Sequence, residues 1–147
     1  MKIKILILAI LPLLLVGCDI FDEGDTRKVY DGPTVVAFFP LQQEVSLGAG
    51  VATVEVQLIG EQRDQALPVN FEVDGGSTAQ AGVHYNVATA SPVSIEAGTS
   101  TVNIAIQLIG GSLDAGQEVR LTLNLLGAGD GVEASVNLAT ANIFIRG

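Results

Sequence analysis

A strictly alternating stretch that begins at Thr101 constrains the fold of this chain most strongly. Over eight residues, apolar side chains alternate with polar or small ones. A period of two predicts a β-strand with one face buried and the other in solvent. We therefore expect four side chains to point into a core, namely Val102, Ile104, Ile106 and Leu108.

Similar short segments, separated by glycine and proline turns, occur along most of the chain. They cover residues 34–39, 51–59, 67–73, 93–95, 119–125 and 141–146, with a weaker candidate at 132–138. The simplest interpretation of segments 51–59 and 67–73 is a pair of antiparallel strands with one face in solvent. Helical periodicity is absent after residue 18. We therefore predict an all-β chain with one domain, an immunoglobulin-like antiparallel β-sandwich of seven to nine strands over residues 34–147.

One unit of the sequence recurs after fifty residues. Residues 53–73 and 103–123 share six identical positions, and their inward positions stay apolar. Internal duplication explains this similarity, and so does parallel selection on two similar strand pairs in one sandwich. The sequence leaves both explanations open.

The first 17 residues have the pattern of a signal peptide. Lys2 and Lys4 precede a twelve-residue apolar run, which is too short to cross a bilayer as a helix. The run ends in a sequence that matches the lipobox of bacterial lipoprotein precursors, Leu15-Val16-Gly17-Cys18. We expect signal peptidase to recognise Leu15, Val16 and Gly17, and Cys18 to be lipidated. The alternative is a plain secretory signal followed by an incidental cysteine.

Residues 18–33 read as a lipidated cysteine followed by an acidic, flexible tether. Asp19, Asp22, Glu23 and Asp25 follow the cysteine closely. Cleavage of the signal peptide removes two lysines and leaves five basic and sixteen acidic residues. The net charge therefore changes from −9 to −11. Such a charge repels nucleic acid, and we expect no nucleic-acid partner. We expect attachment to the bacterial envelope through lipid, at the outer membrane, because acidic residues close behind the cysteine resemble a signal for display on the outer surface. Aspartate directly after the cysteine also resembles an inner-membrane retention signal, and a solvated linker would explain the same charges.

Several short motifs resemble the Calx-beta family. They are Ala81-Gly82-Val83-His84-Tyr85, the strand Val93-Ser94-Ile95, the turn Glu96-Ala97-Gly98-Thr99 and the alternating strand that follows. The form with histidine before tyrosine is similar to Calx-beta-like domains of uncharacterised Bacteroidota lipoproteins. The resemblance covers residues 34–146 and implies a β-sandwich without implying an activity. It gives Gly82, His84, Tyr85 and Gly98 a structural role in turns.

Calcium is the metal that the resemblance suggests. Calx-beta domains that bind calcium gather acidic residues at one end of the sandwich, but here the motif aspartate is His84. Gly110-Gly111 replaces the acidic pair that the family has after the long strand. The remaining weak candidates are Asp74, Asp114, Glu118 and Asp130, for which a solvated acidic face is the alternative. We therefore predict no cofactor, with calcium as the alternative.

Catalysis would depend on the single histidine, His84. A hydrolase would pair it with Ser91 or Ser94, yet the chain has no Gly-x-Ser-x-Gly elbow. We predict that the protein is not an enzyme and has no catalytic residues.

Glycan binding fits the envelope setting, but it usually needs exposed aromatic side chains. The chain has no tryptophan, and its tyrosines are Tyr30 in the tether and Tyr85, which we expect to pack on the core. We assign Phe38, Phe39, Phe71 and Phe144 to the core. These assignments lower the case for a sugar site.

The remaining function is a non-enzymatic binding, adhesion or structural role, whose partner the sequence does not identify beyond an envelope protein or a glycan. The segments Thr34–Phe39 and Ala141–Arg146 read as edge strands that a partner strand could extend. The alternatives are a glycan-binding accessory lipoprotein of a polysaccharide uptake system and a calcium-stabilised adhesion domain.

Overall fold

The computed structural model describes residues 30–147, which form ten strands and two short 3₁₀ helices. The elements are β1 (Val35–Phe39), β2 (Gln42–Ser46), η2 (Leu47–Ala49), β3 (Val51–Ile59), β4 (Leu67–Val73), β5 (Tyr85–Val87), β6 (Val93–Ile95), β7 (Thr101–Leu108), β8 (Glu118–Ala128), η3 (Gly129–Gly131), β9 (Glu133–Ala134) and β10 (Thr140–Arg146). The predicted all-β class is confirmed.

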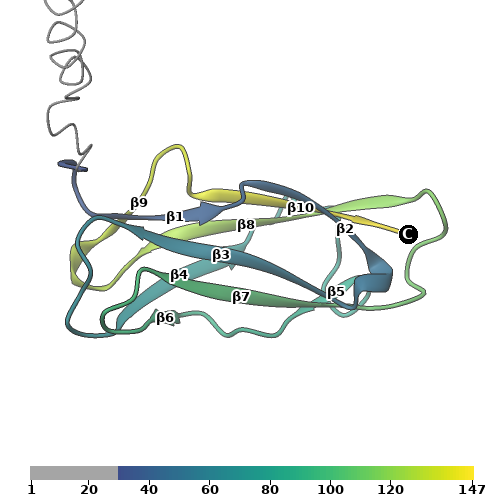
Figure 1. The fold of residues 1–147 in the computed structure, drawn as a ribbon. Helices are drawn as coiled ribbons and strands as arrows, with labels where there is room; N and C mark the ends of the chain where they lie inside the picture. Colours follow the sequence, from purple (N-terminus) through teal and green to yellow (C-terminus); the bar gives the residue numbers. More distant parts are fainter. Residues whose placement is uncertain (1–29) are drawn as a thin grey trace, which may run out of the picture.

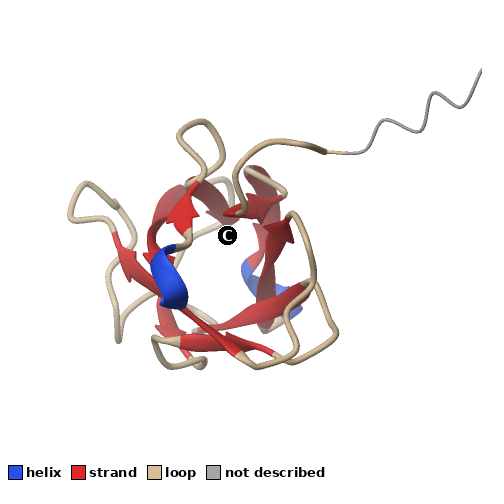
Figure 2. Cartoon of the chain, turned by 90° about the vertical axis from the view of Figure 1, so that its left-hand side faces the viewer, coloured by secondary structure: helices blue, strands red, loops and turns tan. Residues whose placement is uncertain are grey.

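The strands form two five-stranded sheets around one interior (Figures 1 and 2). Sheet A has the order β5-β7-β3-β1-β9, and sheet B has the order β2-β10-β8-β4-β6. Neighbouring strands are antiparallel except for the pairs β1–β9 and β2–β10. The predicted sandwich is confirmed. The count is ten rather than seven to nine because β2 is a separate strand in sheet B and because the residues after His84 form the short strand β5, which alternation did not predict.

Alternation along the sequence correctly identified the buried faces. On β7, Ile104 and Ile106 have no exposed surface and Leu108 is 6% exposed, while Val102 is half-buried. The inward residues of β3 are at most 5% exposed, and they are Ala52, Val54, Val56 and Leu58. These side chains meet those of sheet B in one hydrophobic core. Removing them from water provides most of the favourable free energy of folding.

The pairing expected for segments 51–59 and 67–73 is wrong. β3 lies in sheet A and β4 lies in sheet B, so the two strands are not neighbours. Alternation shows that a strand has a dry face, but both sheets direct their dry faces at the same core. The residues between β3 and β4 lead the chain across the sandwich, whose sheets are about 10 Å apart.

Residues of the internal repeat pair with each other in both sheets. Val54 pairs with Ile104 in sheet A, and Val73 pairs with Leu123 in sheet B. Both pairs join residues that lie fifty positions apart, as in the sequence repeat. In an antiparallel ladder, however, the separation between partners changes by two at each step, so one pair fifty positions apart does not by itself indicate duplication. Both explanations of the repeat stay open.

The two segments expected at sheet edges are covered on both sides. β10 lies between β2 and β8, and β1 lies between β3 and β9. Beyond β9, the Phe38 N–H donates to the Leu138 carbonyl at 2.8 Å, which continues the cover along β1. The edge strands are instead β5, β9, β2 and β6, and each has at most five residues. The prediction that Thr34–Phe39 and Ala141–Arg146 accept a partner strand is therefore wrong.

The two ends of the sandwich carry different loops. β1 begins at Val35, which pairs with Ile59 at the end of β3. β10 ends at Arg146, which pairs with Glu118 at the start of β8. These positions lie at opposite ends in Figure 1, and we call them the Val35 end and the Arg146 end. The chain enters the sandwich at the Val35 end.

Candidate functional site

The residues predicted to carry the lipid anchor lie outside residues 30–147. This applies to Cys18 and to the signal peptidase site, Leu15, Val16 and Gly17. Within the described residues, no helix is long and apolar enough to span a membrane. The anchor therefore stays a prediction.

The turn around His84 is held by contacts to the backbone. The Gln80 N–H donates to Nδ1 of His84 at 2.9 Å, and the Gly82 N–H donates to the Tyr85 carbonyl at 2.8 Å. Gly82 has a φ of 76°, a region that favours glycine. Tyr85 is 3% exposed, and this burial raises the pKa of its hydroxyl. His84 and Gly82 thus hold the turn through backbone hydrogen bonds, and Tyr85 packs in the core.

Gly98 belongs to a second turn, at the Val35 end. Its φ is 72°, and its N–H donates to the Arg63 carbonyl at 2.8 Å. This bond joins the loop after β6 to the loop after β3. The serine considered as a nucleophile is also engaged, because Ser91 Oγ accepts the Phe71 N–H at 2.9 Å. The described contacts do not link Ser91 to His84.

The four acidic candidates for a calcium site are dispersed. β8 rises about 3.4 Å per residue, so Glu118 at its start and Asp130 beyond its end are roughly 35 Å apart. Asp74 accepts the Gly76 N–H at 2.7 Å and the Asn124 amide at 2.8 Å. The Gly76 bond chiefly, then Asn124 and the charge of Arg120, lower the pKa of Asp74.

Asp130 lines a shallow hollow at the Val35 end, together with Gln62, Arg63, Asp64 and Gln65. Across residues 30–147, no group of three or more His, Cys, Asp or Glu side chains is arranged to hold a metal ion. The described residues therefore do not bring together a ligand set from the candidates Asp74, Asp114, Glu118 and Asp130.

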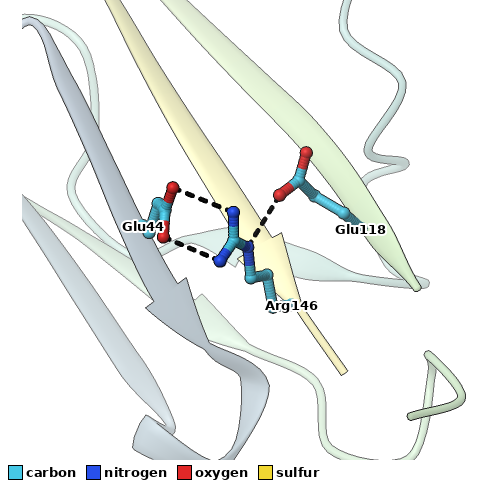
Figure 3. Close-up of polar contacts among 3 residues, drawn as sticks. All are labelled: Glu44, Glu118 and Arg146. Carbon is cyan, nitrogen blue, oxygen red and sulfur yellow. Dashed lines mark hydrogen bonds and ion pairs between the residues drawn. The ribbon is translucent and has the colours of Figure 1, made fainter. Parts of the chain in front are cut away.

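A charged cluster at the Arg146 end joins three strands (Figure 3). Arg146 forms a two-point contact with Glu44, at 2.8 and 2.9 Å, and its Nε donates to Glu118 at 2.8 Å. The Glu118 hydrogen bond chiefly, then the charge of Glu44, raise the pKa of Arg146. All three side chains are at least 41% exposed, so solvent screens the pairs.

A hollow of about 370 Å³ lies beside this cluster, and Gly116, Gln117 and Gly147 line it together with Glu118 and Arg146. The Arg146 guanidinium is already paired with the carboxylates of Glu44 and Glu118. The cluster is therefore suited to holding β2, β10 and β8 together at their ends.

The assignment of all four phenylalanines to the core is wrong for two of them. Phe38 and Phe71 are buried, at 2% and 6% exposed, but Phe39 is 60% exposed. Phe144 is half-buried and points outward, because its neighbours Ile143 and Ile145 fill the inward positions. The period of two would have revealed both errors, since adjacent residues of a strand face opposite sides.

The outer face of sheet B carries polar groups that bond to one another. Thr122 Oγ1 lies 2.8 Å from Asn142 Oδ1, and Thr140 Oγ1 donates to Asn124 Oδ1 at 3.0 Å. Asn124 in turn donates to Asp74. Many of the polar side chains around Phe144 are therefore already bonded to other side chains.

The outer face of sheet A differs in this respect. Phe39 on β1 lies opposite Glu55 on β3, and Glu55 lies opposite Asn103 on β7. The Gln57 amide donates to Glu55 Oε1 at 2.6 Å. We call this surface the Phe39 face, and it consists of Phe39, Thr53, Glu55, Gln57, Thr101 and Asn103. The sequence did not reveal this face because Phe39, which is 60% exposed, was expected in the core.

The fold has well-matched counterparts among solved structures. The apo form of the Calx CBD1 domain aligns with a TM-score of 0.65 and 22% identity, over 78% of this chain and 97% of that one. The chain has a Calx-beta-like fold. The Calx CBD2 domain aligns with a TM-score of 0.64 and 15% identity, over 80% of this chain and 90% of that one.

A candidate carbohydrate-binding protein from Bacteroides ovatus also has this Calx-beta-like sandwich as part of its structure. It aligns with a TM-score of 0.57 and 18% identity, over 76% of this chain and 36% of that one. No family model matches the chain, and no curated protein matches it either.

Proposed function

We propose that this protein is a lipid-anchored β-sandwich of the bacterial envelope that binds a partner without catalysing a reaction. The position at which the chain enters the sandwich carries this proposal. Residues 18–33 connect Cys18 to the Val35 end of the sandwich. The two outer sheet faces run along the sandwich, and the Arg146 end lies opposite the point at which the chain enters. A protein held at Cys18 would therefore present these surfaces away from the bilayer.

Two observations support a binding role over a structural one alone. The Phe39 face leaves a large aromatic side chain in solvent, where it contributes little to the core. Sandwiches of the same fold include a calcium-binding domain of CALX1.1 and the candidate carbohydrate-binding protein from Bacteroides ovatus. We place the protein at the outer membrane, facing outward, because acidic residues follow the lipidation site.

Replacing Cys18 with serine should move the protein from the membrane fraction to the soluble fraction. Each buried CH₂ of an acyl chain contributes about 0.8 kcal/mol, so two or three chains hold a protein firmly, and serine offers no thiol for the thioether. Fractionation of cells and incorporation of labelled fatty acid measure the effect. Asp19→Ser is the matched control and should stay on the membrane.

Sedimentation of the Cys18→Ser protein with membranes would contradict the anchor. Display on the cell surface is tested separately, by adding protease to intact cells. The wild-type protein should be cleaved under conditions that leave a periplasmic marker intact. Protection equal to that of the marker would place the domain on the inner side of the outer membrane.

A further inference from the structure

Phe39 is the exposed aromatic side chain that lies on a strand covered on both sides. It is 60% exposed, although β1 runs between β3 and β9 in sheet A. A single exposed apolar side chain is common on protein surfaces and indicates nothing alone. The arrangement of polar groups beside Phe39 makes it informative.

A prearranged carboxylate lies next to Phe39. Glu55 is its direct cross-strand partner, and the Gln57 amide holds one oxygen of Glu55 at 2.6 Å. Asn103 continues the row on β7. Adjacent strands are about 4.8 Å apart, so the row from Phe39 to Asn103 spans roughly 10 Å. An aromatic group, a fixed carboxylate and an amide thus follow one line across three strands.

The polar groups of the Phe39 face remain available to a ligand. On the outer face of sheet B, Asn124 and Asn142 are bonded to neighbouring side chains. By contrast, the side chains of Thr53, Thr101 and Asn103 form no hydrogen bond with any residue between 30 and 147. These three residues are exposed, so their polar groups can bond to solvent or to the hydroxyl groups of a ligand.

The charge of the face restricts the chemistry of the ligand. Glu55 is the charged residue on the strands that form it, and neither lysine nor arginine occurs on β1, β3, β5, β7 or β9. The chain as a whole carries a net charge of −9. Acidic polymers are therefore repelled. A sugar ring offers a C–H face that packs on an aromatic side chain and hydroxyl groups that bond to carboxylate and amide groups.

We propose that the Phe39 face binds a neutral polysaccharide, with Phe39 packing against a sugar ring and Glu55 and Asn103 bonding to its hydroxyl groups. An open sheet face accommodates an extended polymer, whereas small molecules usually bind in enclosed pockets. This assignment rests on the proposed binding role and names its ligand class.

The test is affinity electrophoresis of the full-length protein in detergent. The gels contain xyloglucan, arabinoxylan, galactomannan or mixed-linkage β-glucan, and further gels contain polygalacturonate as an acidic polymer. At least one neutral polysaccharide should slow the wild-type protein. Phe39→Ala should weaken that affinity about tenfold or more, as expected for a central aromatic contact. Phe144→Ala, on the other sheet face, should bind like the wild type.

Thermal unfolding of each variant shows whether a loss of affinity comes from a loss of folding. Phe39 is mostly exposed, so Phe39→Ala should melt within about 2 °C of the wild type. Asn103→Ala should lose affinity in the same direction without unfolding. The assignment is overturned if none of the four neutral polymers slows the wild-type protein, if Phe39→Ala and Phe144→Ala bind equally, or if polygalacturonate alone binds. Any of these results leaves the membrane release of Cys18→Ser, and hence the anchor, untouched.

Discussion

Replacing Ile104 with aspartate should leave the sandwich unfolded at room temperature. Ile104 has no exposed surface and lies at the centre of β7, opposite Val54. Loss of a buried isoleucine side chain alone costs about 2–5 kcal/mol. A carboxylate there has no partner, so it adds a further large penalty or takes up a proton. Domains of this kind are stable by only about 5–15 kcal/mol.

Thr101→Asp is the matched control for this substitution. It places the same charge on the same strand, but Thr101 faces solvent opposite Gln57. Its free energy of unfolding should change by no more than about 0.5 kcal/mol. Circular dichroism with urea titration distinguishes the two proteins. An Ile104→Asp protein with the melting curve of the wild type would show that β7 faces the other way.

Ending the chain at Ala139, which removes β10, should also abolish folding. β10 pairs with β2 through five residues and with β8 through seven. Its inward residues, Ala141, Ile143 and Ile145, are at most 1% exposed. Without them, the buried leucines of β8 meet water, and β2 loses the one strand that pairs with it among residues 30–147. These losses together exceed the stability of a typical domain.

Arg146→Ala separates the loss of the strand from the loss of its terminal ion pairs. The Arg146 side chain is 52% exposed, and solvent-screened pairs contribute about 0–1 kcal/mol each. This variant should therefore fold, with a small decrease in melting temperature. If the chain that ends at Ala139 still unfolds cooperatively, β10 is a peripheral strand, as the sequence alone had indicated.

Alternation predicted the buried faces of the strands because residues two positions apart in a strand point to the same side of the sheet. It identified Val54 and Ile104 as core residues, and both are fully buried. It did not predict the sheet to which each strand belongs, because β3 and β4 direct similar faces at the same core from opposite sides. That choice depends on contacts between distant segments. The pair of Glu44 and Arg146, for example, joins residues 102 positions apart.

The candidate site was missed for a different reason. Phe38 and Phe39 were both assigned to the core by residue type, although adjacent residues of one strand cannot share a face. Applying the alternation to Thr34–Phe39 would have placed Phe39 outside. The row formed with Glu55 and Asn103 was beyond the reach of the sequence, because it depends on the register of β1, β3 and β7.

The outward position of Phe39 can be measured directly with a Phe39→Trp protein, because the chain has no other tryptophan. We expect emission typical of a tryptophan in water. Iodide should quench it readily, and the neutral polysaccharide that slows the wild-type protein should protect it from iodide. Emission shifted to short wavelength and insensitive to iodide without any polysaccharide would place this side chain in the core and contradict the Phe39 face.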